Sequence, residues 1–214
     1  MTVDDPGAAF KFVGGRLCLD FINTVSGRGS NPGAGDRDYA DIIEKERLVT
    51  FTDLTRWGRA AKVLTSAEAA ALWRAALAAP AKAAQAVNRA RVLREAMYRL
   101  FKTAVEGWRP DAADLEVLNR ELQQARAHER LAPEARGFGW SWHAVGPALD
   151  RVLWPAARSA AELLTSDELQ RVNQCGGEDC RWLFFDTSRN RSRRWCDMAE
   201  CGNRAKVRRF RRRH

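Results

Sequence analysis

Apolar residues recur every three or four positions along most of residues 52–164, and this spacing is typical of amphipathic helices. Thr65 and Glu68 have the order of a capping box, in which a hydroxyl begins a helix and a carboxylate follows three residues later. The longest apolar pattern begins at Pro80 and stops at Gly107. We therefore expect helices over residues 52–64, 66–79, 80–106, 111–130 and 147–164.

The same pattern predicts the ends and the buried faces of these helices. Thr52 or Asp53 is expected to cap the first helix, and Pro147 is expected to open the last one. A second hydroxyl–carboxylate pattern, at residues 165–168, is expected to begin a short helix or strand that leads into the C-terminal segment. The apolar stripe expected on the longest helix consists of Val87, Val92, Leu93, Met97, Leu100, Phe101 and Val105.

A smaller β component is expected beside these helices. Residues 10–13, 42–49 and 137–142 have short strand-like patterns. Residues 182–185 and 194–196 could form the two strands of a C-terminal hairpin, whose tip would lie near residue 190. Residues 17–25 fit both helical and strand spacing, and we favour a helix. The glycines and the proline of residues 26–38 predict a loop.

Four of the five cysteines stand in the C-terminal segment, as the pairs Cys175/Cys180 and Cys196/Cys201. Two cysteine pairs at this separation are typical of a zinc site, because two short loops can each deliver two thiolates to one tetrahedral ion. Two disulfides or four unrelated buried cysteines are the alternatives. Zinc is favoured because no secretory signal precedes the chain and a reducing compartment keeps thiols free. Four thiolates leave no open ligand position, so we expect structural Zn²⁺.

Positive charge is concentrated in the same segment. Residues 175–214 hold 12 Arg/Lys and 5 Asp/Glu, a net charge of +7, out of +9 for the whole chain. A localised basic patch is typical of nucleic-acid binding, whereas a solvated basic tail is the alternative. The expected contacts are Arg189, Arg191, Arg193 and Arg194 on the hairpin tip, and Arg204, Lys206, Arg208, Arg209, Arg211 and Arg212 on a helix after Cys201.

That helix carries two apolar residues, Val207 and Phe210, which would share one face and could dock on the hairpin. Asn203 is placed to cap it, although Asn203 and Arg204 could equally contact nucleic acid. Phosphate contact is the firmer expectation for the arginines, because arginine binds phosphate with two parallel hydrogen bonds.

Polar residues interrupt an apolar stretch near the N-terminus. If this stretch is helical, Asp20, Asn23 and Thr24 lie on one face, and Arg94 or Arg99 on the longest helix could supply a counter-charge. Such a cluster can line a ligand pocket, or it can form a buried hydrogen-bond network that holds the β component in place. The sequence leaves both interpretations open. Cys18 lies among apolar neighbours and is expected to be a core residue.

The sequence Cys201-Gly202-Asn203-Arg204, with the other three cysteines at these spacings, resembles the CGNR zinc finger found at the C-terminus of a bacterial protein family. The stretch of residues 14–24 is similar to the opening motif of the ABATE domain, an α-helical domain with a β arm that precedes this finger. The resemblance implies a transcription regulator that responds to stress or to a ligand. It favours a small-molecule or effector pocket at Asp20, Asn23, Thr24 and Arg94.

The expected fold is mainly α. Residues 1–168 would form an ABATE-like helical domain with a β arm, and residues 169–214 a treble-clef-like zinc finger with a β-hairpin and a helix. The expected function is DNA binding by the finger and sensing of a small ligand or a partner by the helical domain. An adaptor that binds RNA or protein is one alternative. An enzyme with a site at Asp20, Asn23 and Thr24 is the other.

Further expectations follow from patterns that the sequence lacks. It shows no phosphate-binding loop, nucleophile elbow or zinc-protease motif, so no catalytic residue is expected. No run approaches the roughly twenty apolar residues that a membrane helix needs. We therefore expect a cytoplasmic protein whose main partner is nucleic acid, DNA rather than RNA. A symmetric DNA site would also suggest a homodimer.

Overall fold

The computed structural model describes residues 10–28, 43–177 and 180–212. A mainly helical chain with short antiparallel hairpins is confirmed. The helices are α1 (Leu17–Ile22), α2 (Phe51–Ala60), α3 (Ser66–Ala78), α4 (Pro80–Glu106), α5 (Ala112–His128), α6 (Leu153–Leu164) and α7 (Asn203–Arg211). The strands are β1 (Val25–Arg28), β2 (Ile43–Glu46), β3 (Glu129–Pro133), β4 (Phe138–Trp142), β5 (Val172–Gln174) and β6 (Leu183–Phe185). Two short helical segments are the 3-10 helix η3 (Asp167–Arg171) and the π-helical η4 (Met198–Gly202).

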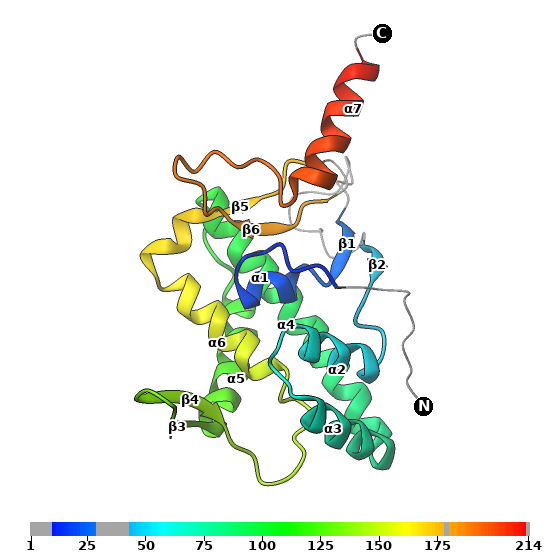
Figure 1. Cartoon of the computed structure of the whole chain (residues 1–214), viewed down its shortest axis with the longest axis vertical. Coiled ribbons are helices and arrows are strands. Elements are labelled where there is room, and N and C mark those ends of the chain that lie inside the picture. The colour runs from blue at the N-terminus through cyan, green and yellow to red at the C-terminus, as the bar shows by residue number, and fades with distance from the viewer. Residues whose placement is uncertain (1–9, 29–42, 178–179, 213–214) are drawn as a thin grey trace.

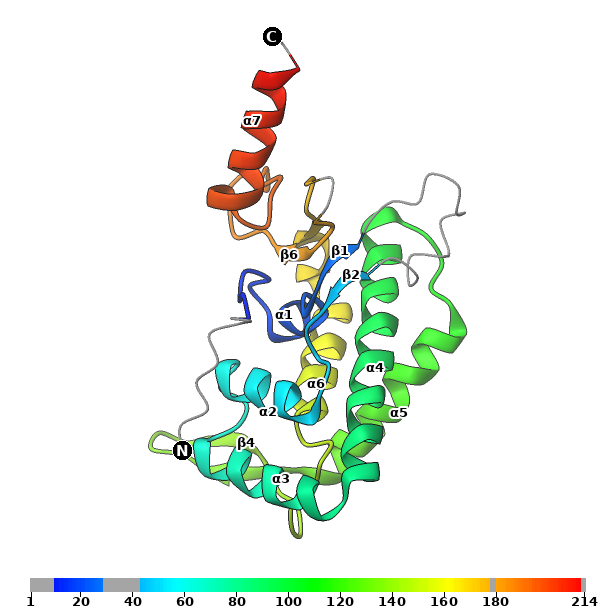
Figure 2. The ribbon, with the colours of Figure 1, turned by 90° about the vertical axis from the view of Figure 1, so that its right-hand side faces the viewer.

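The long helix α4 organises the fold (Figure 1). Helix α5 packs against α4 and α6, and the short helix α1 lies against both α4 and α6. Helices α2 and α3 cover the first half of α4 (Figure 2). Pro80 stands at the first position of α4, and Gly107 ends it in the left-handed conformation that favours glycine. Both ends of α4 therefore lie where the sequence predicts them.

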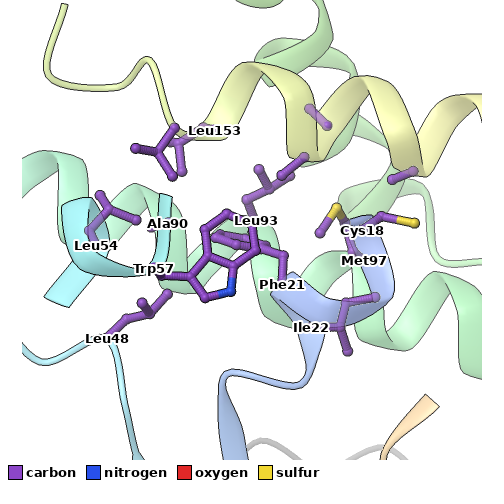
Figure 3. Close-up of a cluster of buried hydrophobic side chains, with 14 of the residues drawn as sticks. Cys18, Phe21, Ile22, Leu48, Leu54, Trp57, Ala90, Leu93, Met97 and Leu153 are labelled. Carbon is purple, nitrogen blue, oxygen red and sulfur yellow. The ribbon is translucent and has the colours of Figure 1, made fainter. Parts of the chain in front are cut away.

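The main core surrounds α1 (Figure 3). Cys18, Phe21 and Ile22 are fully buried, and the ring of Phe21 meets the edge of Trp57 at a centroid distance of 4.9 Å. Because α1 is enclosed by other elements on most sides, apolar residues occur along its whole length. That enclosure explains why residues 17–25 fit two spacings at once: residues 17–22 form the expected helix and residues 25–28 form a strand.

Three separate two-stranded antiparallel sheets complete the described part of the chain. Strands β1 and β2 form an arm, of which the sequence predicts β2 within residues 42–49 but not β1. Strand β3 pairs with β4 in a hairpin that leaves the helical body (Figure 1). The expected loop at residues 26–38 lies mostly outside the described residues, and its first three residues belong to β1. Within the described ranges, no helix is long and apolar enough to span a bilayer.

Two predicted helix starts are wrong. Thr50 caps α2 and forms a capping box with Asp53, so the cap lies before the predicted Thr52 or Asp53. Helix α6 begins at Leu153 and not at Pro147, because Pro155 is tolerated only in a first helical turn. The pattern at residues 165–168 is no capping box, because the hydroxyls of Thr165 and Ser166 donate to carbonyls of the last turn of α6. The expected short helix nevertheless begins there, as η3, and β5 follows it toward Cys175.

Two predicted strands are also wrong. Residues 10–13 form no strand, and Phe10 and Val13 instead pack against the main core and the cysteine cluster respectively. Residues 194–196 do not pair with β6; the partner of β6 is β5, with Val172 opposite Phe185. On α4, Val92 and Val105 lie outside the buried stripe, with 46% and 38% of their surface exposed.

Both faces of strand β6 are buried, each in a different core. Leu183 and Phe185 point into the main core, whereas Trp182 and Phe184 belong to a second small core around the cysteines. A strand alternates its side chains between two faces, so β6 has one face in each core. An apolar run without alternation is typical of such a strand, which is covered on both sides.

Candidate metal centre and nucleic-acid interface

Four cysteine sulfurs converge beside β6. Cys175 directly follows β5, Cys180 precedes β6, Cys196 ends the loop after β6, and Cys201 lies in η4. All four sulfurs lie within 4.8 Å of one another. Sγ of Cys196 is 3.5 Å from Sγ of Cys180 and 3.7 Å from Sγ of Cys201. Zinc bound tetrahedrally at about 2.3 Å holds its sulfurs about 3.8 Å apart, so this donor set fits zinc.

The charges of the sulfurs lead to the same conclusion. Without a cation, the hydrogen bonds from Cys180 and Cys196 lower the pKa of Cys175, and those bonds raise the pKa of the two donors because they must keep their protons. Burial raises the pKa of Cys201. The thiol cluster by itself thus favours one thiolate. Four thiolates at these distances need a divalent cation between them.

The residues after Cys201 build the metal centre. A Cβ atom on Gly202 would lie 2.5 Å from Sδ of Met198, so glycine lets the Met198 side chain pack onto η4, and a larger residue would displace that side chain. The side-chain amide of Asn203 donates a hydrogen bond to the backbone carbonyl of Ala199 at 2.9 Å. The predicted cap is therefore wrong: Asn203 is the first residue of α7 and closes η4 instead.

Two polar donors face the sulfurs. The guanidinium of Arg204 lies 3.9 Å from Sγ of Cys201 and 3.7 Å from a carboxylate oxygen of Glu200. The backbone N–H of Cys196 donates to Sγ of Cys175 at 3.3 Å. Both donors favour thiolate over thiol, because each brings positive charge to sulfur. The motif residues Gly202, Asn203 and Arg204 therefore all have a structural role in holding the ligands.

A residue that the sequence analysis missed holds the loop between β6 and Cys196. The carboxylate of Asp186 is buried and accepts hydrogen bonds from the backbone N–H of Ser188 at 2.8 Å and of Arg193 at 2.9 Å. Burial opposes its ionisation, but these hydrogen bonds lower the pKa of Asp186 below its usual range. The sequence Asp186-Thr187-Ser188 is a typical Asx-turn and could have indicated this role.

Helix α7 begins at the metal centre and projects away from the body (Figures 1 and 2). Its apolar residues do not dock on the hairpin as predicted: Val207 and Phe210 are 50% and 65% exposed. The expected basic residues Lys206, Arg209 and Arg211 are exposed along the same helix. The helix therefore presents basic and apolar side chains to solvent, on a base that the metal ligands hold.

The predicted hairpin tip is a loop, since residues 194–196 form no strand. Arg189 and Arg194 are exposed there, and Arg191 donates to the side chain of Gln170 at 3.0 Å. Arg193 has internal partners: it donates to the carbonyls of Trp195 and Cys196, and it lies 4.8 Å above the ring of Phe184. Arg193 therefore holds the loop between β6 and Cys196, whereas the side chains of Arg189 and Arg194 are exposed to solvent.

The finger is joined to the helical domain by polar contacts. The side chain of Asn23 accepts from the N–H of Leu183 at 3.1 Å and donates to its carbonyl at 2.8 Å. The indole N–H of Trp182 donates to the carbonyl of Val25 at 2.5 Å. Gln174, next to the first zinc ligand, donates to the hydroxyl of Tyr98 on α4 at 2.8 Å. The side chain of Asn23 thus pairs with the main chain of β6 and links the finger to the helical domain.

The other polar residues of the N-terminal cluster also have partners inside the protein. Both carboxylate oxygens of Glu46 accept from Arg94, at 2.6 and 2.7 Å, and Arg94 also contacts Thr24 at 3.3 Å. Glu95 accepts from Arg94 at 2.8 Å and from Arg28 at 2.5 Å. Arg28 and Arg94 are each 1% exposed. These contacts form the buried network that the sequence left as one alternative, and it ties both arm strands to α4.

Asp20 lies apart from this network, where its carboxylate accepts from the N–H of Gly14 at 2.8 Å. Burial raises the pKa of Asp20 from 3.8 to about 6. The folded protein therefore binds the proton more tightly than the unfolded chain. The stability contributed by protonated Asp20 is fully present below pH 3.8 and is lost as the pH rises through about 6.

Asp20→Asn should remove this pH dependence, because an asparagine carbonyl still accepts the Gly14 hydrogen bond without carrying a charge. We expect the variant to gain stability relative to the wild type as the pH rises from 3.8 to 6. Urea denaturation of both proteins across this range measures the difference, and titration of the zinc ligands cancels in it. Parallel stability curves for the two proteins would contradict the prediction.

Comparison with protein-family models gives two matches. Residues 15–167 match the ABATE model, which is described as "Putative stress-induced transcription regulator", and residues 171–214 match the CGNR zinc finger. Among curated proteins, the search finds no match for this chain. The expected zinc finger with a hairpin and a helix is thus confirmed, and its four clustered cysteines form a structural zinc site. The chain belongs to the ABATE family, and its C-terminus is a zinc finger of the CGNR type.

Proposed function

We propose that this protein is a DNA-binding transcription regulator whose zinc finger contacts DNA through α7. The observation that carries the proposal is the position of this helix. It leaves the metal centre directly into solvent, and its sequence NRAKVRRFR holds five basic residues and no acidic one. An α-helix with its side chains is about 10–12 Å across and so fits a major groove about 12 Å wide, and the nine residues of α7 give it a length of about 14 Å.

The stability of α7 also supports a charged partner. Isolated helices shorter than about 12 residues are marginal in water, and like charges one turn apart weaken them further. Lys206 and Arg209, three positions apart on α7, are such a pair. Phosphate groups would relieve this repulsion. The end of α7 should therefore gain order on binding, while zinc holds its first turn.

Duplex DNA is favoured over duplex RNA by the shape of this surface. The major groove of B-form DNA admits a helix, whereas that of A-form RNA is too narrow for side-chain readout. Arg189 and Arg194, on the loop next to the metal centre, would contact the phosphate backbone. An adaptor that binds single-stranded RNA through the same residues is the second candidate, because Phe210 is exposed among arginines and could stack on a base.

The helical domain would act on the finger through their shared contacts. A ligand or partner that moves the β arm would shift Val25 and Asn23, and these residues hold Trp182 and Leu183 of the finger. A cavity of about 420 Å³ between α2, α3 and α4 is a candidate effector site; it is lined by Trp73, Leu77, Val87, Asn88 and Arg91 among others. Its volume falls in the range of small-molecule sites. Asp20, Asn23, Thr24 and Arg94 would then transmit the signal rather than bind the ligand.

DNA binding is tested by replacing three exposed basic residues of α7. The variant Lys206→Ala/Arg209→Ala/Arg211→Ala keeps Arg204, which faces Cys201. Each phosphate contact contributes about 0.9 to the slope of log K against log salt concentration, so losing three contacts should reduce the slope by about 2.7. Fluorescence anisotropy with a labelled duplex, from about 50 to 200 mM salt, measures this slope.

The matched control removes the same charge from another surface. Arg74→Ala/Arg120→Ala/Arg126→Ala changes three exposed arginines on α3 and α5 and should leave the slope unchanged. Equal loss in both triple variants would mean that only net charge matters. Stronger binding of wild-type protein to single-stranded RNA than to duplex DNA would favour the adaptor.

A further inference from the structure

The β3–β4 hairpin has an apolar face exposed to solvent. Leu131 lies opposite Trp140, and Pro133 lies opposite Phe138, and side chains directly opposite each other share a face. Leu131, Phe138 and Trp140 are 60%, 74% and 58% exposed. At the base of the hairpin, Trp142 continues this face into the body, where its ring lies 6.0 Å from that of Trp154.

The free edge of β4 carries backbone groups that face outward. The N–H of His143 donates to the carbonyl of His128, and that of Glu134 to the carbonyl of Gly137. Hydrogen-bonded pairs alternate along an antiparallel ladder, so Phe138 and Trp140 stand in the pairs whose N–H and C=O groups point away from β3. These groups are available to another strand.

The edge of β4 also lacks the features that usually protect such an edge. Its sequence FGWSW contains no charge and no proline, whereas β3 carries Glu129, Arg130 and Pro133. Exposed edge strands normally carry charges, prolines or bulges, because a flat apolar edge recruits another strand. Only one side of this hairpin is therefore open to pairing.

We propose that β4 pairs with β4 of a second copy of this chain, antiparallel about a two-fold axis near Gly139. Phe138 of each copy would then lie opposite Trp140 of the other, and the two hairpins would form one four-stranded sheet. Trp142 is left out of this pairing, because its carbonyl already accepts from Arg151 at 3.1 Å. The two apolar faces would be continuous on the same side of the sheet.

A second copy is the partner that the chemistry of this edge fits. An uncharged strand meets its own copy without like-charge repulsion, and an isologous interface needs only one such patch. Nucleic acid would require cations along β4, and β4 has none. The hairpin and α7 lie at opposite ends of the molecule (Figure 1), so the dimer leaves α7 free. The dimer does not depend on DNA binding.

The area of the patch sets the expected affinity. Phe138 and Trp140 lie on the edge strand and would contact the other copy, whereas Leu131 lies one strand away, so the buried area is well below the roughly 800 Å² that a standard interface takes from each partner. Main-chain hydrogen bonds between the two β4 edges add to these contacts. The dissociation constant is therefore expected on the order of 1–100 μM rather than nanomolar.

Sedimentation velocity on the zinc-loaded protein from about 1 to 300 μM tests the proposal, because this range spans the expected dissociation constants. The mass should rise from 24.1 kDa toward twice that value with concentration. Trp140→Glu should remain monomeric over the whole range, because two glutamates would meet near the two-fold axis. Trp140 is 58% exposed in the monomer, so a glutamate there can stay hydrated and the monomer should remain folded.

Trp108→Glu is the matched control, since it makes the same substitution at a residue that is 48% exposed just after α4, outside both the hairpin and the candidate effector cavity. It should dimerise like the wild type. A wild-type protein that stays monomeric at the highest concentration overturns the proposal, as does a Trp140→Glu variant that still dimerises. Unchanged circular dichroism and zinc content of Trp140→Glu show that its monomer is folded.

Discussion

Replacing Cys196 with serine is expected to abolish stoichiometric zinc binding and to unfold the chain from about Asp186 to the end of α7. Structural zinc contributes about 10–16 kcal/mol in small zinc fingers, and Cys196 is 2% exposed and lies between two other ligands. No other core is available to residues 186–212, because α7 is exposed and the loop is held by Asp186 and the zinc ligands. Bound zinc and far-UV circular dichroism measure the change.

The same variant should also weaken the helical domain without unfolding it. Leu183 and Phe185 are buried in the main core, so β6 should stay in place through these contacts and through Asn23. Trp182 and Phe184 face the cysteines and would lose their packing. We expect the free energy of unfolding of the helical domain to fall by about 0.5–3 kcal/mol, the usual coupling between residues in contact.

Cys18→Ala is the control for removing a cysteine. Cys18 is fully buried, and burial raises its pKa to about 12, so it is a poor ligand and should leave the zinc content unchanged. If Cys196→Ser left the unfolding of the helical domain unchanged, the finger would be an independent module. Complete loss of helical signal would show instead that metal and helices fold as one unit.

Replacing Arg94 with methionine is expected to destabilise the protein by about 3 kcal/mol, because it leaves the partly buried carboxylate of Glu46 without its buried cation. Arg94 is 1% exposed and binds Glu46 through two hydrogen bonds as well as Glu95. Burial by itself would raise the pKa of Glu46, and the hydrogen bonds from Arg94 keep it below the usual range. Thermal or urea unfolding of the variant measures the loss.

The double variant Arg94→Met/Glu46→Gln separates pairing from packing. The second substitution removes the negative charge that Glu46 would carry without Arg94, and Glu95 keeps its ion pair with Arg28. The double variant should therefore recover part of the stability lost in Arg94→Met. Arg120→Met is the control for an exposed pair, since Arg120 and Glu116 are both 66% exposed, and it should cost at most about 1 kcal/mol. Equal losses for Arg94→Met and Arg120→Met would contradict the role of burial.

The metal centre was predictable from sequence because its ligands are close together along the chain and chemically distinctive. Four cysteines in two pairs can meet at one ion whatever the rest of the fold is. The partners of Arg94 were not predictable, because Glu46 lies on a separate strand and the intervening chain folds back before the two side chains meet. Asp186 lay between these cases: its Asx-turn is local, but its burial depends on tertiary packing.

Local rules fixed most of the helices. The capping box at Thr65 and the left-handed glycine at Gly107 act within a few residues, and α3 and α4 begin and end where these signals stand. Tertiary structure decided which strand pairs with which. The sequence shows β6 as an apolar run, but only packing against both α1 and the cysteines determines that β5, and not residues 194–196, is its partner.

The sequence by itself therefore determined the zinc ligands, the basic helix and the helical class, because each depends on residue type and short spacing. Only the tertiary structure decided that α7 points away from the body, that Asn23 and Arg94 serve internal contacts, and that the finger shares a strand with the main core. These features depend on surfaces that are distant in sequence and meet only when the whole chain is folded.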